Sequence, residues 1–159
     1  MRRLVVAVFL MSAVGCDLMH NGDPVLIDKP TSPDPLDARF ANGVYKGPGK
    51  ATSNGCPGFS DTATVTGTIQ VDQHGQGSWR KIHESAGGLI FEFDIQLQVL
   101  SATSASFAAT TKRMMGDGYY YDIVDRGTLT TSSALTVTQT FTREGIPCTT
   151  EYKLDLRKQ

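Results

Sequence analysis

Cysteine is the residue type in this chain with the clearest chemistry, and it occurs three times. Cys16 follows an apolar run near the start, whereas Cys56 and Cys148 lie far apart in the rest of the chain. An odd number of cysteines in an exported protein requires that one of them serve a purpose other than pairing within the chain. If Cys16 is that residue, Cys56 and Cys148 form the expected pair, because a disulfide persists in an oxidising compartment. Two free thiols are the alternative.

Residues 1–15 have the pattern of an export signal peptide. Arg2 and Arg3 form a short basic start, and the next eight residues, LVVAVFLM, are all apolar. This run is too short to cross about 30 Å of hydrocarbon as a permanent helix. A basic start, a short apolar run and small residues before a cleavage point are instead typical of a signal peptide that is removed. An ordinary secretory signal followed by a coincidental cysteine is the alternative interpretation.

The residues around the cleavage point resemble the lipobox of bacterial lipoproteins. Ala13 and Val14 are small or apolar, and Gly15 directly precedes the obligatory cysteine, Cys16. The match departs from the usual pattern at Ala13, where that family mostly has Leu. The resemblance covers residues 1–16. It implies that diacylglyceryl is attached to the Cys16 thiol and that cleavage leaves this residue as the new N-terminus.

Lipidation of Cys16 would make this an exported protein of the bacterial cell envelope, held to a membrane by acyl chains such as palmitate. Two or three such chains, at about 0.8 kcal/mol per buried methylene, form a durable anchor. Asp17 resembles the signal that retains enteric lipoproteins in the inner membrane. That rule differs between bacterial groups, so the sequence leaves the choice between inner and outer membrane open.

Residues 16–41 have the composition of a tether. Acidic residues are spread between prolines, and large apolar side chains are few. The prolines are Pro24, Pro30, Pro33 and Pro35. Such a stretch favours extended conformations and cannot bury a core. At its end, residues 36–40 are expected to form a short helical turn that docks on the domain. The chain is therefore divided into a signal peptide (1–15), a lipidated cysteine with a Pro-rich tether (16–41) and a folded domain (42–159).

The domain itself is electrically balanced. The chain has 15 Lys and Arg against 16 Asp and Glu, and four of these basic residues and five of these acidic residues precede residue 42. The remainder therefore carries a formal net charge of zero. Because no basic patch is available to follow a phosphate backbone, nucleic acid is not an expected partner.

From residue 42 onward the hydrophobic pattern has a period of two. The clearest run, 89–99, places six apolar side chains on one face and carboxylates and amides on the other. This alternation is typical of strands with one buried and one solvated face. The expected strands are residues 43–52, 64–72, 77–84, 89–99, 103–111, 118–130, 135–142 and 148–157.

Eight strands with mostly tight turns predict an all-β domain, an eight-stranded antiparallel up-and-down barrel. In such a barrel the last strand lies against the first and runs opposite to it. Cys56 follows the first expected strand and Cys148 opens the last, so a disulfide between them would join the two edges that no hairpin connects. A seven- to eight-stranded β-sandwich is the alternative.

The ionisable residues form no recognisable catalytic or metal-binding motif. His74, His83 and Glu84 could contribute to a metal site, but their spacing fits no standard ligand pattern. Glu92 and Asp94 lie two residues apart and therefore share one face of a strand. Glycosidases use two carboxylates that lie close to each other, so this pair is a candidate for such chemistry. They share that face with glutamines, which is typical of a solvated exterior. We therefore expect no catalytic residues, no metal and no cofactor.

Two aromatic segments are candidates for recognition. Tyr119, Tyr120 and Tyr121 could form an exposed rim, because tyrosines offer large, rigid contact area. The favoured interpretation places Tyr119 and Tyr121 in the core and packs Tyr120 against a neighbouring side chain.

Gly-Ser-Trp at residues 77–79 resembles the Gly-x-Trp of lipocalins, which lies near the first strand of that family. Here the motif falls in the third expected strand. No ligand binding is therefore carried over, and Trp79 is expected in the core.

These observations favour a non-enzymatic, lipid-anchored envelope lipoprotein whose barrel binds a partner protein or a small hydrophobic ligand. An envelope-acting hydrolase that uses carboxylate or histidine residues is the alternative. The filling of the barrel interior distinguishes ligand binding from docking of a partner, because a ligand needs a cavity and a solid core offers none. Small lumen residues would leave space, whereas large aromatic side chains would fill it. We expect a mostly filled interior, occupied by Trp79, Phe91, Phe93, Phe107 and Tyr152.

Replacing the expected lipid attachment site tests the anchor. Cys16→Ala should leave the precursor unlipidated and release it from membranes, because no thiol remains at the cleavage point to carry diacylglyceryl. Labelling of the membrane fraction with a palmitate analogue measures this directly. Labelling that is unchanged in the variant would contradict the anchor.

Overall fold

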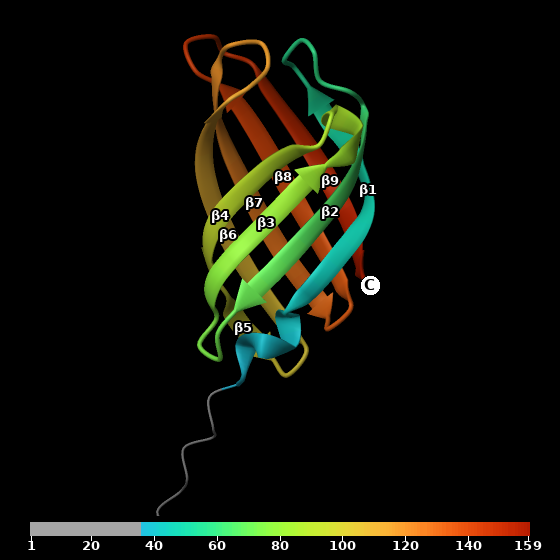
Figure 1. The fold of residues 1–159 in the computed structure, drawn as a ribbon, viewed down its shortest axis with the longest axis vertical. Helices are drawn as coiled ribbons and strands as arrows, with labels where there is room; N and C mark the ends of the chain where they lie inside the picture. Colours follow the sequence, from blue (N-terminus) through green and yellow to red (C-terminus); the bar gives the residue numbers. More distant parts are fainter. Residues whose placement is uncertain (1–35) are drawn as a thin grey trace, which may run out of the picture. The chain divides into compact units, whose positions relative to one another are not determined.

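The computed structural model describes residues 36–159, so the expected signal peptide, Cys16 and most of the tether lie outside the described part. Figure 1 shows this part as a barrel of long strands. No helix within residues 36–159 is long and apolar enough to cross a membrane. The described elements are η1 (Ala38–Ala41), β1 (Gly43–Asn54), β2 (Thr62–Val71), β3 (Gln76–His83), η2 (Glu84–Ala86), β4 (Leu89–Gln96), β5 (Gln98–Ser101), β6 (Ser104–Met114), β7 (Tyr120–Thr131), β8 (Ala134–Arg143) and β9 (Thr149–Lys158).

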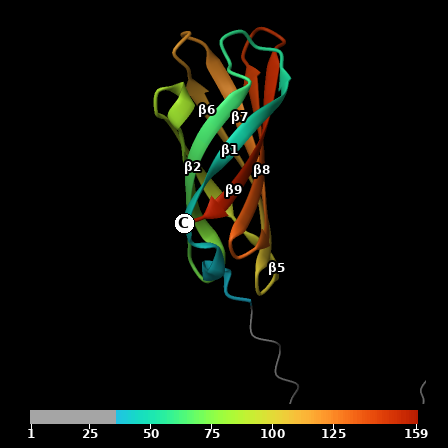
Figure 2. The same ribbon diagram turned by 90° about the vertical axis from the view of Figure 1, so that its right-hand side faces the viewer.

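All the described strands belong to one antiparallel sheet, in the order β4-β3-β2-β1-β9-β8-β7-β6-β5. Strands that follow one another along the chain pair as neighbours, except for β4 and β5, and β1 pairs with β9. The sheet curls on itself, and Figure 2 shows its strands enclosing the interior from a second side. The predicted all-β, up-and-down barrel is confirmed, and the sandwich alternative is not the fold.

The expected strand 89–99 is two strands rather than one. β4 pairs with β3 from Leu89 to Gln96, and β5 pairs with β6 from Gln98 onward. Leu97 between them leaves the strand pattern, and its amide donates to the carbonyl of Gly75 at 2.8 Å. Because the chain changes partner at this residue, the described sheet has nine strands instead of eight. β4 continues beside β6, with no strand pairing between them among the described residues.

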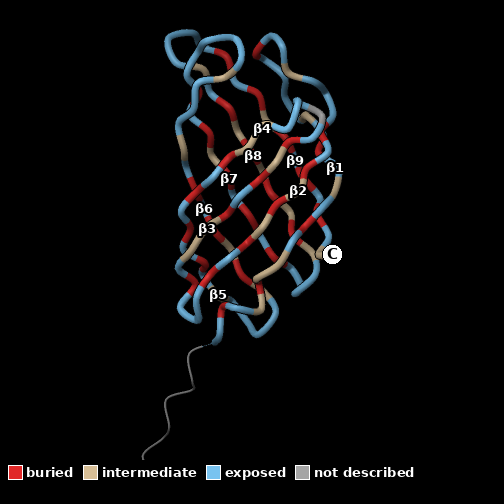
Figure 3. Tube along the Cα trace, viewed as in Figure 1, coloured by how far each residue is buried: buried red, intermediate tan, exposed pale blue. Residues whose placement is uncertain are grey.

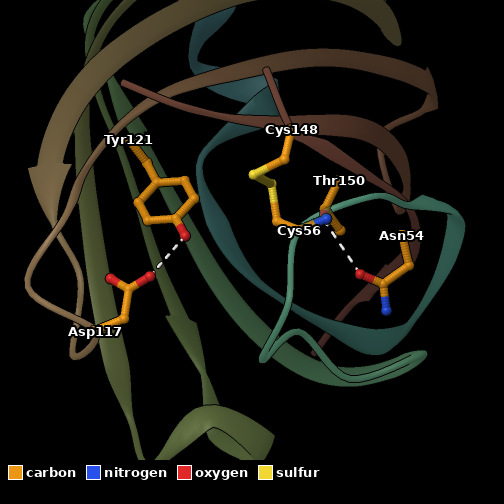
Figure 4. The surroundings of a disulfide bond; sticks show 6 residues. All are labelled: Asn54, Cys56, Asp117, Tyr121, Cys148 and Thr150. Atoms are coloured by element: carbon orange, nitrogen blue, oxygen red, sulfur yellow. Dashed lines mark hydrogen bonds between the residues drawn. A yellow bond between two sulfur atoms is a disulfide. The ribbon is translucent and has the colours of Figure 1, made fainter. Parts of the chain in front are cut away.

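The disulfide lies where the sequence predicts it. Cys56 and Cys148 are joined across a separation of 92 residues, with their Cα atoms 5.0 Å apart, just beyond the paired ends of β1 and β9. The Cys56 amide donates to Thr150 Oγ1 at 3.3 Å, and that hydroxyl donates to Asn54 Oδ1 at 3.2 Å. Figure 4 shows these residues together. Covalent and hydrogen bonds thus hold the two edges that no hairpin connects.

Burial alternates along the strands, as the red and pale segments of Figure 3 show. The five aromatic side chains expected inside are all buried. Trp79 and Phe107 have ring centres 5.9 Å apart. Glycines make room for both rings, because a Cβ at Gly67 would lie 1.9 Å from the Trp79 ring and one at Gly127 would lie 2.2 Å from Phe107. The interior is therefore mostly filled at this level.

The helix η1 closes one end of the barrel. Ala38 and Ala41 are fully buried, and the Ala38 amide donates to the carbonyl of Gln73 at 3.1 Å. The Tyr45 hydroxyl donates to the carbonyl of Ala41 at 2.7 Å. The helical turn expected at residues 36–40 is present, shifted by one or two residues. The packed unit therefore begins before residue 42, the boundary that composition indicates.

Removing the disulfide should destabilise the barrel. In the unacylated chain (Cys16→Ala), Cys56→Ser together with Cys148→Ser should lower the free energy of unfolding by roughly 4–5 kcal/mol, because the unfolded chain regains the entropy of a long loop. Urea unfolding without reductant measures the difference. The denatured Cys16→Ala parent should show no reactive thiol until it is reduced; two reactive thiols before reduction would contradict the pairing.

Candidate functional site

A cavity of about 350 Å³ opens at the end of the barrel opposite η1. Four connections surround this mouth: residues 55–61, 84–88, 115–119 and 144–148. The walls are largely apolar, and the apolar lining side chains include Phe59, Leu89, Phe91, Met115, Phe141 and Tyr152. A concave, aromatic-lined space of this volume is typical of small-molecule sites. The barrel is thus filled at its closed end and hollow at its mouth.

Phe59 brings the β1–β2 loop into the mouth. Its ring centre lies 5.0 Å from that of Phe141 and 5.6 Å from that of Tyr121. The loop is held from both sides, since Asn54 Nδ2 donates to the Phe59 carbonyl at 3.0 Å and the Tyr152 hydroxyl donates to the carbonyl of Ser60. Because Cys56 belongs to the same loop, the disulfide also fixes one wall of the cavity.

His83 forms part of the inner wall. It is only 5% exposed, and its Nε2 is inaccessible to solvent. Its ring centre lies 5.4 Å from that of Phe91 and 6.3 Å from those of Phe141 and Tyr152. Burial, followed by the positive charge of Lys81, lowers the pKa of His83 to about 3, and a side-chain hydrogen bond with Gln139 opposes the shift. The imidazole is therefore neutral at physiological pH.

A buried ion pair lies behind this wall. Lys81 and Asp125 are both fully buried and contact each other directly. Trp79 Nε1 donates to the same carboxylate oxygen, Asp125 Oδ2, at 2.7 Å. Burial lowers the pKa of Lys81, and the nearby Asp125 opposes this shift. Neither charged group lines the cavity, so the pair offers no charge to it.

Three side chains of β3 that point into the barrel explain how the histidine and the ion pair come to lie next to each other. Trp79, Lys81 and His83 alternate with more exposed residues and all point into the barrel, with His83 nearest the mouth. Asp125 occupies the corresponding inward phase of β7. Sequence analysis assigned no role to Lys81 or Asp125. The available signal was their position, because each is a charged residue at an inward phase of a strand.

The three tyrosines have different environments. Tyr121 is buried, as expected, and its hydroxyl donates to Asp117 Oδ2 at 2.8 Å (Figure 4). Tyr119 is 46% exposed, so its expected core position is wrong. β7 begins only at Tyr120, and Tyr119 still belongs to the turn, where strand alternation does not apply. Tyr120 is 49% exposed instead of packing under a neighbour. Tyr119 and Tyr120 therefore form an exposed rim, and Tyr121 does not.

Arg143 lies beside this rim. Its guanidinium carbon lies 3.3 Å from the centre of the Tyr119 ring, a stacked cation–π arrangement. The Glu144 amide donates to the Tyr120 carbonyl at 2.9 Å, which links the β8–β9 connection to the β6–β7 hairpin. The aromatic rim is thus supported by a neighbouring loop.

The other candidate residues lie elsewhere. His74 is exposed in the β2–β3 turn, at the opposite end of β3 from His83. Glu84 accepts from Lys46 at 3.0 Å and from Thr66 at 2.8 Å. In residues 36–159, no three His, Cys, Asp or Glu side chains gather closely enough to hold a metal ion.

The paired carboxylates Glu92 and Asp94 are exposed on the outer face of β4. Glu92 accepts from Arg80 Nε at 3.1 Å, and the two residues form a surface ion pair. Neither carboxylate lines the mouth cavity. The structure therefore does not bring these acids together with the buried histidine.

No protein family, curated protein or solved structure was found to match this chain. The interpretation of the mouth cavity therefore depends on its own residues.

The neutral state of His83 predicts a pH dependence of stability. The unfolded histidine takes up a proton below pH about 6.5, whereas the folded one does so only near pH 3. Between these values the unfolded state binds more protons, so stability falls as the pH decreases, by about 1.4 kcal/mol per pH unit well below pH 6.5. His83→Gln removes this contribution.

Urea unfolding between pH 7.5 and pH 4.5 measures the effect. Over this range the parent should lose about 2–3 kcal/mol more than His83→Gln does. His74→Gln is the matched control, because His74 is exposed, and it should follow the parent. Parallel profiles for the parent and His83→Gln would show that the buried histidine is not held neutral.

Proposed function

We propose that this protein is a non-enzymatic lipoprotein of the bacterial cell envelope whose barrel binds a small hydrophobic ligand at its mouth. The cavity is the observation that carries this proposal. Its volume lies in the range of small-molecule sites, roughly 300–1,000 Å³. The lining is largely apolar and includes phenylalanine, leucine and methionine side chains, so transfer of an apolar molecule from water into this space is favourable.

The connectivity of the chain supports this role for an anchored protein. The first described residues enter the barrel at the closed end, beside η1, and the mouth lies at the other end (Figure 1). A lipid on Cys16, attached through the Pro-rich segment, would therefore join the protein at the end away from the cavity. The tether would then join the barrel at the end opposite the mouth and would not have to pass the mouth loops.

Docking of a partner protein at the mouth is the second candidate function. Exposed large apolar side chains gather on the two linked loops beside the cavity: Met114, Tyr119, Tyr120 and Ile146. Exposed aromatic and methionine side chains are enriched at interfaces. The rim surrounds a cavity that a protein partner would leave unfilled, and for this reason we favour the small ligand.

The arrangement of the ionisable groups favours a binding role over hydrolysis. Asp117 and Tyr121 line the cavity together with His83. The Tyr121 hydroxyl is engaged with Asp117, and Nε2 of His83 is inaccessible to solvent. A histidine base requires a nucleophile or a water-activating arrangement within hydrogen-bond reach. The cavity walls offer no such pair.

Binding of pyrene, an uncharged fluorescent hydrocarbon, tests the proposal. The unacylated chain (Cys16→Ala) should bind pyrene saturably, with the emission spectrum shifting to that of an apolar environment. Ala86→Trp places a large ring at the lining position of η2, and it should weaken binding about tenfold by removing accessible apolar wall.

Val44→Trp is the matched control, because Val44 is exposed on β1 and does not line the cavity. Its pyrene affinity should equal that of the parent. Absence of saturable binding, or equal affinities for Ala86→Trp and Val44→Trp, would overturn the assignment of the cavity as the binding site.

A further inference from the structure

We propose that the cavity selects organic cations, in which an apolar body carries one ammonium group, and that the Asp117 carboxylate binds this group. The inference rests on the proposed ligand-binding function and names the class of ligand. Three features of the described residues carry it: the charge of the lining, the fixed position of the carboxylate and the aromatic rings beside it.

Asp117 gives the cavity its charge. Among the described residues that line the space, it is the only one that is ionised at neutral pH. The hydrogen bond from Tyr121 lowers the pKa of its carboxyl below the ordinary value. The other titratable lining residues are His83, which burial keeps neutral, and Tyr121 and Tyr152, whose pKa values are raised chiefly by burial. The lining therefore carries one negative charge and no positive one.

Two hydrogen bonds fix this carboxylate at the mouth. Asp117 Oδ2 accepts from the Tyr121 hydroxyl at 2.8 Å (Figure 4), and Oδ1 accepts from the Tyr119 amide at 3.1 Å. A carboxylate has about four lone-pair sites, so each oxygen keeps capacity for a further partner. Asp117 is exposed and belongs to no ion pair among the described residues. A cation that enters the mouth thus meets a negative group whose position is already set.

Tyr121 connects the carboxylate to the aromatic walls. Its hydroxyl donates to Asp117, and its ring centre lies 5.6 Å from that of Phe59. The Phe59 ring centre in turn lies 5.0 Å from that of Phe141 and 6.5 Å from that of Tyr152. Phe59 is inclined to these three rings by 42–62°, so it does not cover them as a parallel stack would.

Such rings suit both parts of an organic cation. The face of an aromatic ring attracts an ammonium group, most strongly where water is excluded, and the same ring offers apolar contact to the body of the ligand. The Phe91 ring already has two cations near it, since Lys81 Nζ lies 5.6 Å and the Arg113 guanidinium carbon 5.7 Å from its centre. Among the described residues, no cation lies over the rings of Phe59 or Phe141.

The arginines near the mouth lie outside the lining. The Arg143 guanidinium stacks on Tyr119, and its charge acts on Asp117 without forming an ion pair. Arg113 lines a separate groove between β4 and β6. Neither arginine lines the cavity. An anionic head group inside the cavity would therefore face a carboxylate, and no lysine or arginine among the described residues lines the space to receive it.

The remaining charges near the walls do not favour an anion. Lys81, behind the inner wall, is paired with Asp125. Asp61 belongs to the connection between β1 and β2, and its negative charge, after burial, raises the pKa of Tyr152. Acidic side chains therefore act on the cavity from two of the four connections at the mouth.

Competition against pyrene tests this selection in the unacylated full-length chain (Cys16→Ala). The competitors are decyltrimethylammonium, decanoate and 1-decanol at pH 7.5, each below its micelle or solubility limit, so that the head group differs on a chain of similar length. The cation should displace pyrene at a concentration about tenfold lower than decanoate does, because Asp117 attracts one and repels the other. Displacement by decanoate at an equal or lower concentration would overturn the inference.

Substitution of the acid tests its role directly. Asp117→Asn removes the charge and keeps an oxygen that can accept from Tyr121. It should weaken the cation about three- to tenfold more than it weakens pyrene or decanol. Asp94→Asn is the matched control, because Asp94 is exposed on the outer face of β4 and does not line the cavity, and it should leave all these affinities unchanged. Asp117→Ser replaces the Asn variant if the latter folds poorly.

The outcomes distinguish the two levels of the argument. If the parent shows no saturable binding of pyrene, the proposed function and this inference both fail. If pyrene binds but Asp117→Asn, or Asp117→Ser in its place, weakens the cation no more than decanol, ligand binding stands and the role of Asp117 is wrong.

Discussion

Closure of the barrel depends on the junction between β1 and β9. Every other pair of neighbours in the sheet is joined by a short connection along the chain, whereas these two strands come from the ends of the domain. Their backbone pairing and the disulfide between Cys56 and Cys148 replace the missing hairpin. The same disulfide holds the loop that carries Phe59. The covalent link that closes the cylinder therefore also shapes the mouth cavity.

Along its axis the interior changes from apolar and filled, through a charged layer, to a hollow. The lower layer contains Trp79 and Phe107, whose rings occupy space left by glycines on β2 and β7. The middle layer contains Lys81 and Asp125, and the Lys81 ammonium lies 5.1 Å from the centre of the Phe93 ring. A buried ion pair is weak evidence of added stability, but removal of one partner leaves an uncompensated charge. Along β3 the pair lies between the filled layer around Trp79 and the cavity that His83 lines.

Strand periodicity predicted the barrel and the β1–β9 junction, because both follow from which strands are first and last. The disulfide was predicted from the cysteine count, and the strand order agreed with it. Periodicity did not predict the break at Leu97. Apolar alternation continues through this residue although the pairing partner changes, so the pattern contains no signal for the break. Tyr119 was misplaced for a related reason, since the first residue of a strand is poorly defined by alternation.

The site was harder to predict than the fold. An inward-phase Lys or His is visible in the sequence, but its partner is not, and Asp125 lies 44 residues from Lys81. The cavity depends on how Phe59, Phe141 and Tyr152 pack against one another, which periodicity does not specify. Cys16 and most of the tether lie outside the described residues, and the lipid anchor therefore stays a prediction.

The change of partner at Leu97 has a mechanical consequence. Among the described residues, β4 and β6 run side by side without strand pairing, and the Arg113 guanidinium lies 5.7 Å from the Phe91 ring centre. Phe91 also lines the cavity, so this slit borders it. Spreading the wall there would disturb side-chain contacts but break no strand-to-strand hydrogen bonds, whereas every other side of the cylinder is held by a strand ladder.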